Sequence, residues 1–127
     1  MIDKESEVYT RIKYAVINEC ENVSTTYQSS PKKLPYLYIE QISNEGIVYD
    51  LENRESGERS TIELQVYDTG SNAKSKIKNI ISLADSEMTN MGYQRFYGFT
   101  DKPNLPDSLV SCKVARYRRL ICNEDRL

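Results

Sequence analysis

The segment 61–96 constrains the fold most, because the spacing of its apolar residues changes twice. In "TIELQVYD" the apolar residues Ile62, Leu64 and Val66 alternate with the mostly polar residues of the other face, which is typical of a strand. Apolar residues then recur at helical spacing, namely at Ala73, Ile77, Ile80, Ile81, Ala84, Met88 and Met91. Gly92 follows as a left-handed residue that ends a helix. The segment predicts a strand at 59–68, a helix at 71–91 that Ser71 or Asn72 caps, and an aromatic strand at 93–100.

A second helix is predicted at 3–23. Its apolar residues recur at three- and four-residue steps, namely at Val8, Ile12, Ala15, Val16, Cys20 and Val23. Asp3 or Ser6 is the expected cap, since a carboxylate or hydroxyl accepts hydrogen bonds from free amides at a helix start. The next alternating run predicts a strand at 35–43, which is rich in tyrosine as a strand with one exposed face can be.

Residues 44–58 are predicted to form a long arm between the first two strands. Gly46 and Gly57 flank the apolar run "IVYDL", which has acids around it. One interpretation is a solvated hairpin, and the other is an arm that reaches a neighbouring subunit. In the second case the contact residues are Ile47, Val48, Tyr49 and Arg54.

The last predicted strand, 108–121, changes its apolar phase. Val110, Cys112 and Val114 share one face, whereas the later apolar residues Ala115, Tyr117 and Ile121 fall on the other. A strand that buries both sets requires either a bulge or a second surface to bury against.

The basic cluster "ARYRR" in this strand is a candidate contact site. Basic residues next to an aromatic can grip a nucleic-acid backbone. Alternation, however, puts Arg116 and Arg118 on one face of the strand and Arg119 on the other. Charged positions on a strand, or ion pairs between subunits, are therefore the favoured interpretations, and direct nucleic-acid binding is not expected.

Three lysines, Lys74, Lys76 and Lys78, occupy the early turns of the helix at 71–91, and Asp85 and Glu87 the later ones. This order opposes the helix dipole. The lysines form either a solvated face or a surface that meets an acidic partner.

Together these elements predict an α+β fold in a single domain, 1–127. A mainly antiparallel sheet of about four strands is flanked by two helices, in the order α-β-β-α-β-β, with the long arm between the first two strands.

Charge and hydropathy argue against several kinds of partner. The net charge of -2 provides no overall attraction to nucleic acid or to an anionic membrane. No stretch approaches the ~20 apolar residues of a membrane helix, and the acidic start "MIDKESEVYT" lacks a signal pattern. We therefore expect a protein made and kept in a cytosol, with no membrane partner.

Chemical function is not expected either. The chain contains no histidine, no nucleophile elbow and no phosphate-binding loop, which argues against an enzyme, a cofactor or a metal site. Cys20, Cys112 and Cys122 form no CxxC pair and are expected to be reduced, the first two in the core. Asp50 and Glu52 are best explained as solvated charges on the arm.

In the order of its elements the chain resembles a small tail terminator, also called a neck or tail completion protein, of long-tailed bacteriophages. The resemblance rests on four segments, "IELQVYD", "NAKSKIKNIISLADSEM", "MGY" and "RYRRLI". It covers nearly the whole chain at the level of layout. Where such proteins often have Gly-Phe after the helix, this chain has Gly92 and Tyr93.

The resemblance implies a ring of identical subunits, usually six, at the head-proximal end of a tail. Such a homohexamer ring ends polymerisation of the tail tube protein and provides the surface on which the head–tail connector protein docks. It implies a structural protein of the virion that is assembled in the host cytoplasm. Two alternatives remain open: another neck component such as a head-closure protein, or a small non-catalytic module that binds a peptide or nucleic acid by an open strand edge.

Overall fold

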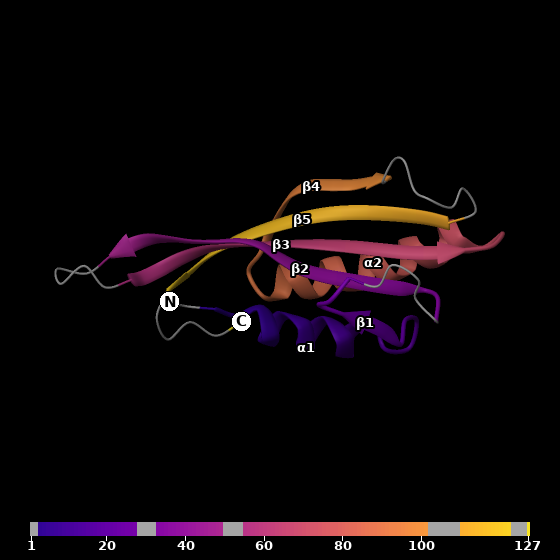
Figure 1. Cartoon of the computed structure of the whole chain (residues 1–127), viewed down its shortest axis with the longest axis horizontal. Coiled ribbons are helices and arrows are strands. Elements are labelled where there is room, and N and C mark those ends of the chain that lie inside the picture. Colours follow the sequence, from indigo (N-terminus) through magenta and orange to yellow (C-terminus); the bar gives the residue numbers. More distant parts are fainter. Residues whose placement is uncertain (1–2, 28–32, 50–54, 102–109, 123–126) are drawn as a thin grey trace.

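Two helices cover one face of a five-stranded sheet (Figure 1). The structure is a computed structural model that describes residues 3–27, 33–49, 55–101, 110–122 and 127. Its elements are α1 (Glu5–Val16), β1 (Asn22–Ser24), β2 (Tyr36–Tyr49), β3 (Glu55–Thr69), α2 (Ala73–Asn90), β4 (Gln94–Asp101) and β5 (Val110–Cys122). The strand order is β1-β2-β3-β5-β4, in which β1 is parallel to β2 and the other pairs are antiparallel.

The predicted α+β class with two helices is confirmed, but two details differ. The sheet has a fifth strand, β1, whose three residues carry no detectable pattern. The first helix ends at Val16 rather than at residue 23, because the amides of Glu19 and Cys20 both bond to the Val16 carbonyl and turn the chain. Val23 therefore reaches the core from β1 and not from the helix.

The predicted arm is mostly a continuation of the strand pair. Register runs from Tyr36 opposite Tyr67 to Tyr49 opposite Glu55, with three register shifts on the way. β5 pairs with β3 from Thr69 to Gly57, where the last pair is Gly57 and Cys122. The distal part of the β2–β3 hairpin therefore projects beyond the helices at one end of the molecule (Figure 1).

The main core lies between the helices and the sheet. Alternate residues of β3 face the helices, and three of them, Ile62, Leu64 and Val66, are fully buried there. The apolar stripe of α2 is buried in the same cluster, as predicted, with Ile77, Ile80, Ile81, Ala84, Met88 and Met91 inside. Ala73 at the start of α2 is also buried. α1 adds Val8, Ile12 and Val16.

A second apolar cluster lies on the face without helices. It contains Tyr36, Tyr38, Tyr67, Cys112 and Val114, all buried. The prediction of an exposed tyrosine face on β2 is therefore wrong. β5 pairs with β3 without a register shift, so its two apolar phases are buried on opposite faces of the sheet, and no bulge is needed.

The two acids that oppose the dipole of α2 have specific partners. Asp85 Oδ1 accepts a hydrogen bond from the Tyr117 hydroxyl at 2.7 Å and from Arg95 at 3.1 Å. Glu87 forms an ion pair with Arg11 of α1 at 2.5 Å. These contacts tie α2 to β5, β4 and α1, and they explain why the acids stand where the dipole disfavours them.

The ends of α2 match the prediction only at the C-terminus. The predicted N-cap residue Asn72 precedes the helix but makes no side-chain capping bond. At the other end Gly92 has φ +82°, and the amides of Gly92 and Tyr93 bond to the carbonyls of Thr89 and Met88. This is the hydrogen-bond pattern of a left-handed glycine that closes a helix.

Replacing Ile80 by alanine should lower the free energy of unfolding by roughly 2–5 kcal/mol, because the side chain is fully buried between α2 and the sheet. The matched control is Leu83→Ala on the same helix, since Leu83 is 40% exposed and should cost less than about 1 kcal/mol. Urea denaturation of both variants measures the difference. Equal midpoints would place Ile80 outside the core.

Cys20 should resist alkylation in the folded protein. Burial raises its pKa to about 11, although backbone hydrogen bonds of Asn22 and Leu37 act in the opposite direction. At pH 8 the thiolate fraction then falls roughly 100-fold below that of an ordinary thiol, and the thiolate is the reactive form. Iodoacetamide labelling at pH 8, read by mass spectrometry with and without urea, tests this, and rapid labelling of folded Cys20 would contradict it.

Candidate interaction surface

The edge strand β4 carries the most unusual surface in the described part of the chain. Every residue from Gln94 to Asp101 is exposed except the half-buried Gly98. Three of them are aromatic: Phe96, Tyr97 and Phe99 are 46%, 42% and 37% exposed. Large aromatic side chains at the surface are typical of sites where another molecule binds.

Arginines hold these rings in place. The guanidinium of Arg118 lies 5.0 Å from the centre of the Phe96 ring, and that of Arg116 lies 5.0 Å from the Tyr97 ring. Arg95 lies 4.1 Å from the Phe99 ring. We call these six residues the arginine–aromatic surface. Each pair combines a cation with a ring face, which favours both groups staying where they are.

Two of the arginines, Arg116 and Arg95, form ion pairs with acidic residues of other elements. Arg116 Nε donates to Glu63 Oε2 at 2.6 Å, and Glu63 is almost completely buried on the face of β3 away from the helices. Arg95 reaches across to Asp85 of α2 at 3.1 Å. The central strand and a core helix therefore fix the orientation of the edge strand.

Gly98 allows β4 to approach β5. Its φ is +103°, and a Cβ placed on it would lie 2.4 Å from the Val114 carbonyl oxygen and 2.8 Å from the Ala115 Cα. These are backbone atoms that cannot move aside. The register of β4 against β5 shifts on both sides of Tyr97, so that the strand is bent rather than flat.

A cleft opens where β4 begins. β4 pairs with β5 only up to Gln94 opposite Arg118, whereas β5 continues to Cys122. The resulting step forms a cleft of about 410 Å³, lined by Arg59, Gly92, Gln94, Arg118, Arg119 and Leu120. Arginine is the only charged residue type in this lining, so the cleft favours carboxylates or other anions.

The three predicted arginines separate as the alternation requires. Arg116 and Arg118 lie on the face away from the helices, beside the rings of β4. Arg119 lies on the other face, where its Nη1 donates to the Met91 carbonyl at the end of α2 at 2.7 Å. The sequence did not single out Arg95, Phe96, Tyr97 and Phe99, although "RFYGF" interleaves a cation with aromatics.

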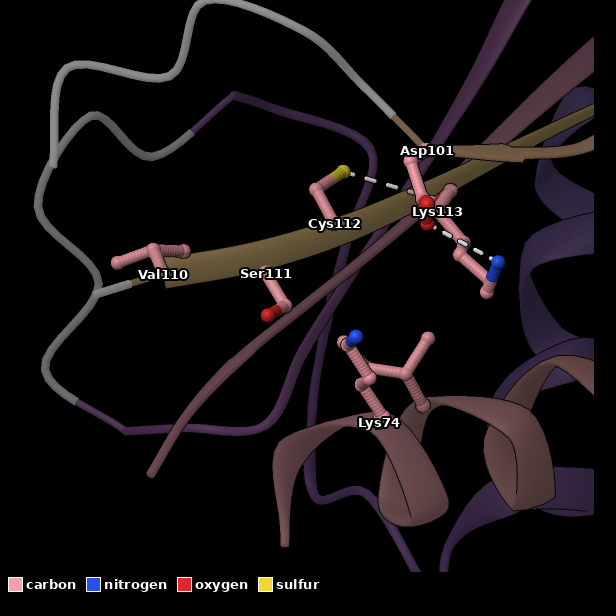
Figure 2. A pocket seen from close by; sticks show the side chains of 7 residues that line it. Lys74, Asp101, Val110, Ser111, Cys112 and Lys113 are labelled. Atoms are coloured by element: carbon pink, nitrogen blue, oxygen red, sulfur yellow. Dashed lines mark hydrogen bonds and ion pairs between the residues drawn. The ribbon is translucent and has the colours of Figure 1, made fainter. Parts of the chain in front are cut away.

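The predicted lysines lie elsewhere. Lys74, Lys76 and Lys78 are all exposed on the first turns of α2. Lys74 lines a cleft of about 200 Å³ with Asp101, Ser111 and Lys113 among others, and Figure 2 shows Ser111 directed toward α2. Lys113 contacts Asp101 at 3.0 Å. This hydrogen bond lowers the pKa of Asp101, and the charges of Lys74 and Lys78 act in the same direction.

The predicted arm residues occupy the opposite end of the molecule. Ile47, Val48 and Tyr49 form the distal end of β2, while Arg54 lies outside the described residues. Figure 1 shows this hairpin at one end of the long axis and the start of α2 toward the other. The structure therefore does not bring the predicted arm, lysine and arginine groups together into one site.

Neither a metal site nor a membrane helix is found in the described segments. No group of three or more cysteine, aspartate or glutamate side chains there could hold a metal ion. No helix there is long and apolar enough to cross a membrane.

Replacing Gly98 by alanine should destabilise the protein by roughly 1–3 kcal/mol and displace β4, because the new methyl group meets the backbone of β5. Gly70→Ala is the matched control, since Gly70 has the same φ of +103° with nothing within 4 Å of its Cβ position. Thermal unfolding of both variants separates the close approach from the backbone strain. Equal losses would show that contact with β5 is unimportant.

No protein-family model matches this sequence, and a comparison with curated proteins finds no match. What the chain does is therefore inferred from its own surfaces, of which the arginine–aromatic surface and the projecting β2–β3 hairpin are the most distinctive.

Proposed function

We propose that the protein is a structural tail terminator of a long-tailed bacteriophage. In this function it forms a homohexamer ring at the head-proximal end of the tail, ends polymerisation of the tube and provides the surface for head docking. The observation that carries the proposal is the β2–β3 hairpin, which extends beyond the helices and beyond the end of β5. A protruding strand pair contributes little to its own core and is suited to reach a neighbouring chain.

The arginine–aromatic surface supports the same function. Aromatic residues and arginine are enriched where proteins bind tightly. Aromatic rings bury large areas with few freely rotating bonds, and arginine supplies several hydrogen-bond donors. Here the rings of Phe96 and Tyr97 are already held by Arg118 and Arg116. Ordering them in a contact therefore costs less conformational entropy than ordering free side chains.

The proposed ring would place different surfaces on its two rims. The start of α2, whose first turns carry the exposed lysines, lies toward the end of the molecule opposite the hairpin (Figure 1). One rim would contact the tail tube protein and the other the head–tail connector protein. Neck components of another kind, such as head-closure proteins, remain a related candidate.

A non-catalytic binding module is the second candidate function. The observation that favours it is the same row of exposed rings and arginines, since bases of single-stranded nucleic acid stack on aromatic rings while arginine contacts phosphates. The two functions differ in assembly, because the ring requires self-association and the module does not. Light-scattering mass and negative-stain images distinguish them.

Shortening the arm should abolish assembly without unfolding the domain. In a variant whose residues 46–57 are replaced by an Asn-Gly turn, the core of helices and sheet keeps its contacts, because β5 meets this segment only through the Gly57–Cys122 pair. The expected result is a cooperative thermal transition together with loss of rings or of tail capping. Normal rings from the shortened protein would refute the role of the arm.

A further inference from the structure

The two long outer edges of the sheet differ in charge. On one side lie β4 and β5, with Lys113 and Arg95, Arg116, Arg118 and Arg119 against the single acid Asp101. On the other side lies β2, which carries Glu40 and Glu45 and neither lysine nor arginine. We call these the basic edge and the acidic edge.

The acidic edge is only partly covered. β1 pairs with Tyr36–Tyr38 of β2, and Glu5 of α1 accepts a hydrogen bond from the Gln41 amide at 2.9 Å, but no other described strand lies on that side of the sheet. Ile42 sits at the register shift between Gln41 and Ser43 and is 42% exposed. The acidic edge therefore offers an apolar side chain between two carboxylates, and the basic edge offers Phe96 and Tyr97 between arginines.

We propose that these edges are the two halves of one contact between copies of this chain: the acidic edge of one subunit docks on the arginine–aromatic surface of the next. This inference rests on the proposed ring function and specifies which surfaces join neighbouring subunits. Opposite charge steers the two edges together and disfavours contacts between like edges. Because the joined surfaces differ, the contact is head-to-tail and repeats from copy to copy until it closes.

Side chains rather than backbone make most of this contact. β4 has two register shifts within its length and is therefore a poor template for a continuous ladder with another strand. Arg116 and Arg95 already bind Glu63 and Asp85 within the chain. Arg118 is exposed beside the arginine-lined cleft and is the residue through which a carboxylate of the acidic edge is held.

Disulfide trapping tests the pairing of edges. Ile42→Cys and Tyr97→Cys are made separately in a Cys122→Ser background, since Cys20 and Cys112 are buried. After mild oxidation of the full-length proteins, the mixture should give at least ten-fold more crosslinked dimer than either variant alone. A chain that carries both substitutions should give a ladder ending at the closed ring. Ile17→Cys, exposed to a similar extent beside α1, replaces Ile42→Cys in the control mixture and should give only background.

Charge reversal tests the electrostatic part. Arg118→Glu and Glu40→Lys should each weaken self-association at least ten-fold, as measured by sedimentation. Mixing the two variants should restore assembly, because Glu40 of one variant then meets Arg118 of the other, and the introduced lysine meets the introduced glutamate. Circular dichroism verifies that both remain folded. Arg118 is chosen because its loss breaks no ion pair seen within the described residues.

The outcomes separate the inference from the proposed function. Rings that form normally but show no mixed crosslink, or that survive both charge reversals, overturn the edge pairing and leave the ring. Crosslinking of either single variant with itself would indicate a two-fold contact and also overturns it. Specific mixed crosslinks in open filaments support the edge contact and contradict the ring. A chain that is monomeric at every concentration, with binding of an oligothymidylate probe that Arg118→Glu abolishes, overturns both in favour of the binding module.

Discussion

The structure depends on the central strand β3, both faces of which are closed to solvent. On the helix side Ile62, Leu64 and Val66 are fully buried under α2. On the other side Glu63 and Gln65 are also buried, although no helix covers them. A carboxylate in such a place is costly unless it is paired. Gln65 Nε2 donates to Glu63 Oε1 at 2.5 Å and Arg116 donates to Oε2 at 2.6 Å, so the charge is satisfied.

This polar pairing connects the centre of the sheet to its edge. The Tyr67 hydroxyl donates to Gln65, Gln65 to Glu63, and Arg116 links Glu63 to the ring of Tyr97 on β4. Arg116, which the sequence suggests as a contact for another molecule, is thus also a structural residue of the sheet. The exposed Tyr97 ring is therefore connected, through Arg116, to a buried carboxylate two strands away.

The sequence predicted elements well where one apolar period ran long enough to be unambiguous. The stripe of α2 and the alternation of β3 each had one consistent period, and Gly92 marked the helix end with the φ that only glycine adopts easily. Prediction failed at α1, because Cys20 and Val23 continue the helical spacing although the chain has already turned at Val16. It failed for the tyrosines of β2 because tertiary contacts, not local pattern, decide which sheet face is buried.

The candidate surface was harder to predict than the fold, because it depends on which strands lie at the edges. Chain order suggests that β4 should follow β3 in the sheet, but β5 takes the place beside β3 and leaves β4 outside. This strand order separates the basic strands β4 and β5 from the acidic strand β2, and the net charge of -2 does not reveal that separation. A bent edge strand such as β4 resists indiscriminate backbone pairing, which would lead to aggregation, while its rings and arginines remain available. In the proposed ring, contact through matched side chains would give more specificity than pairing through an open strand, since specificity then lies in charge and shape.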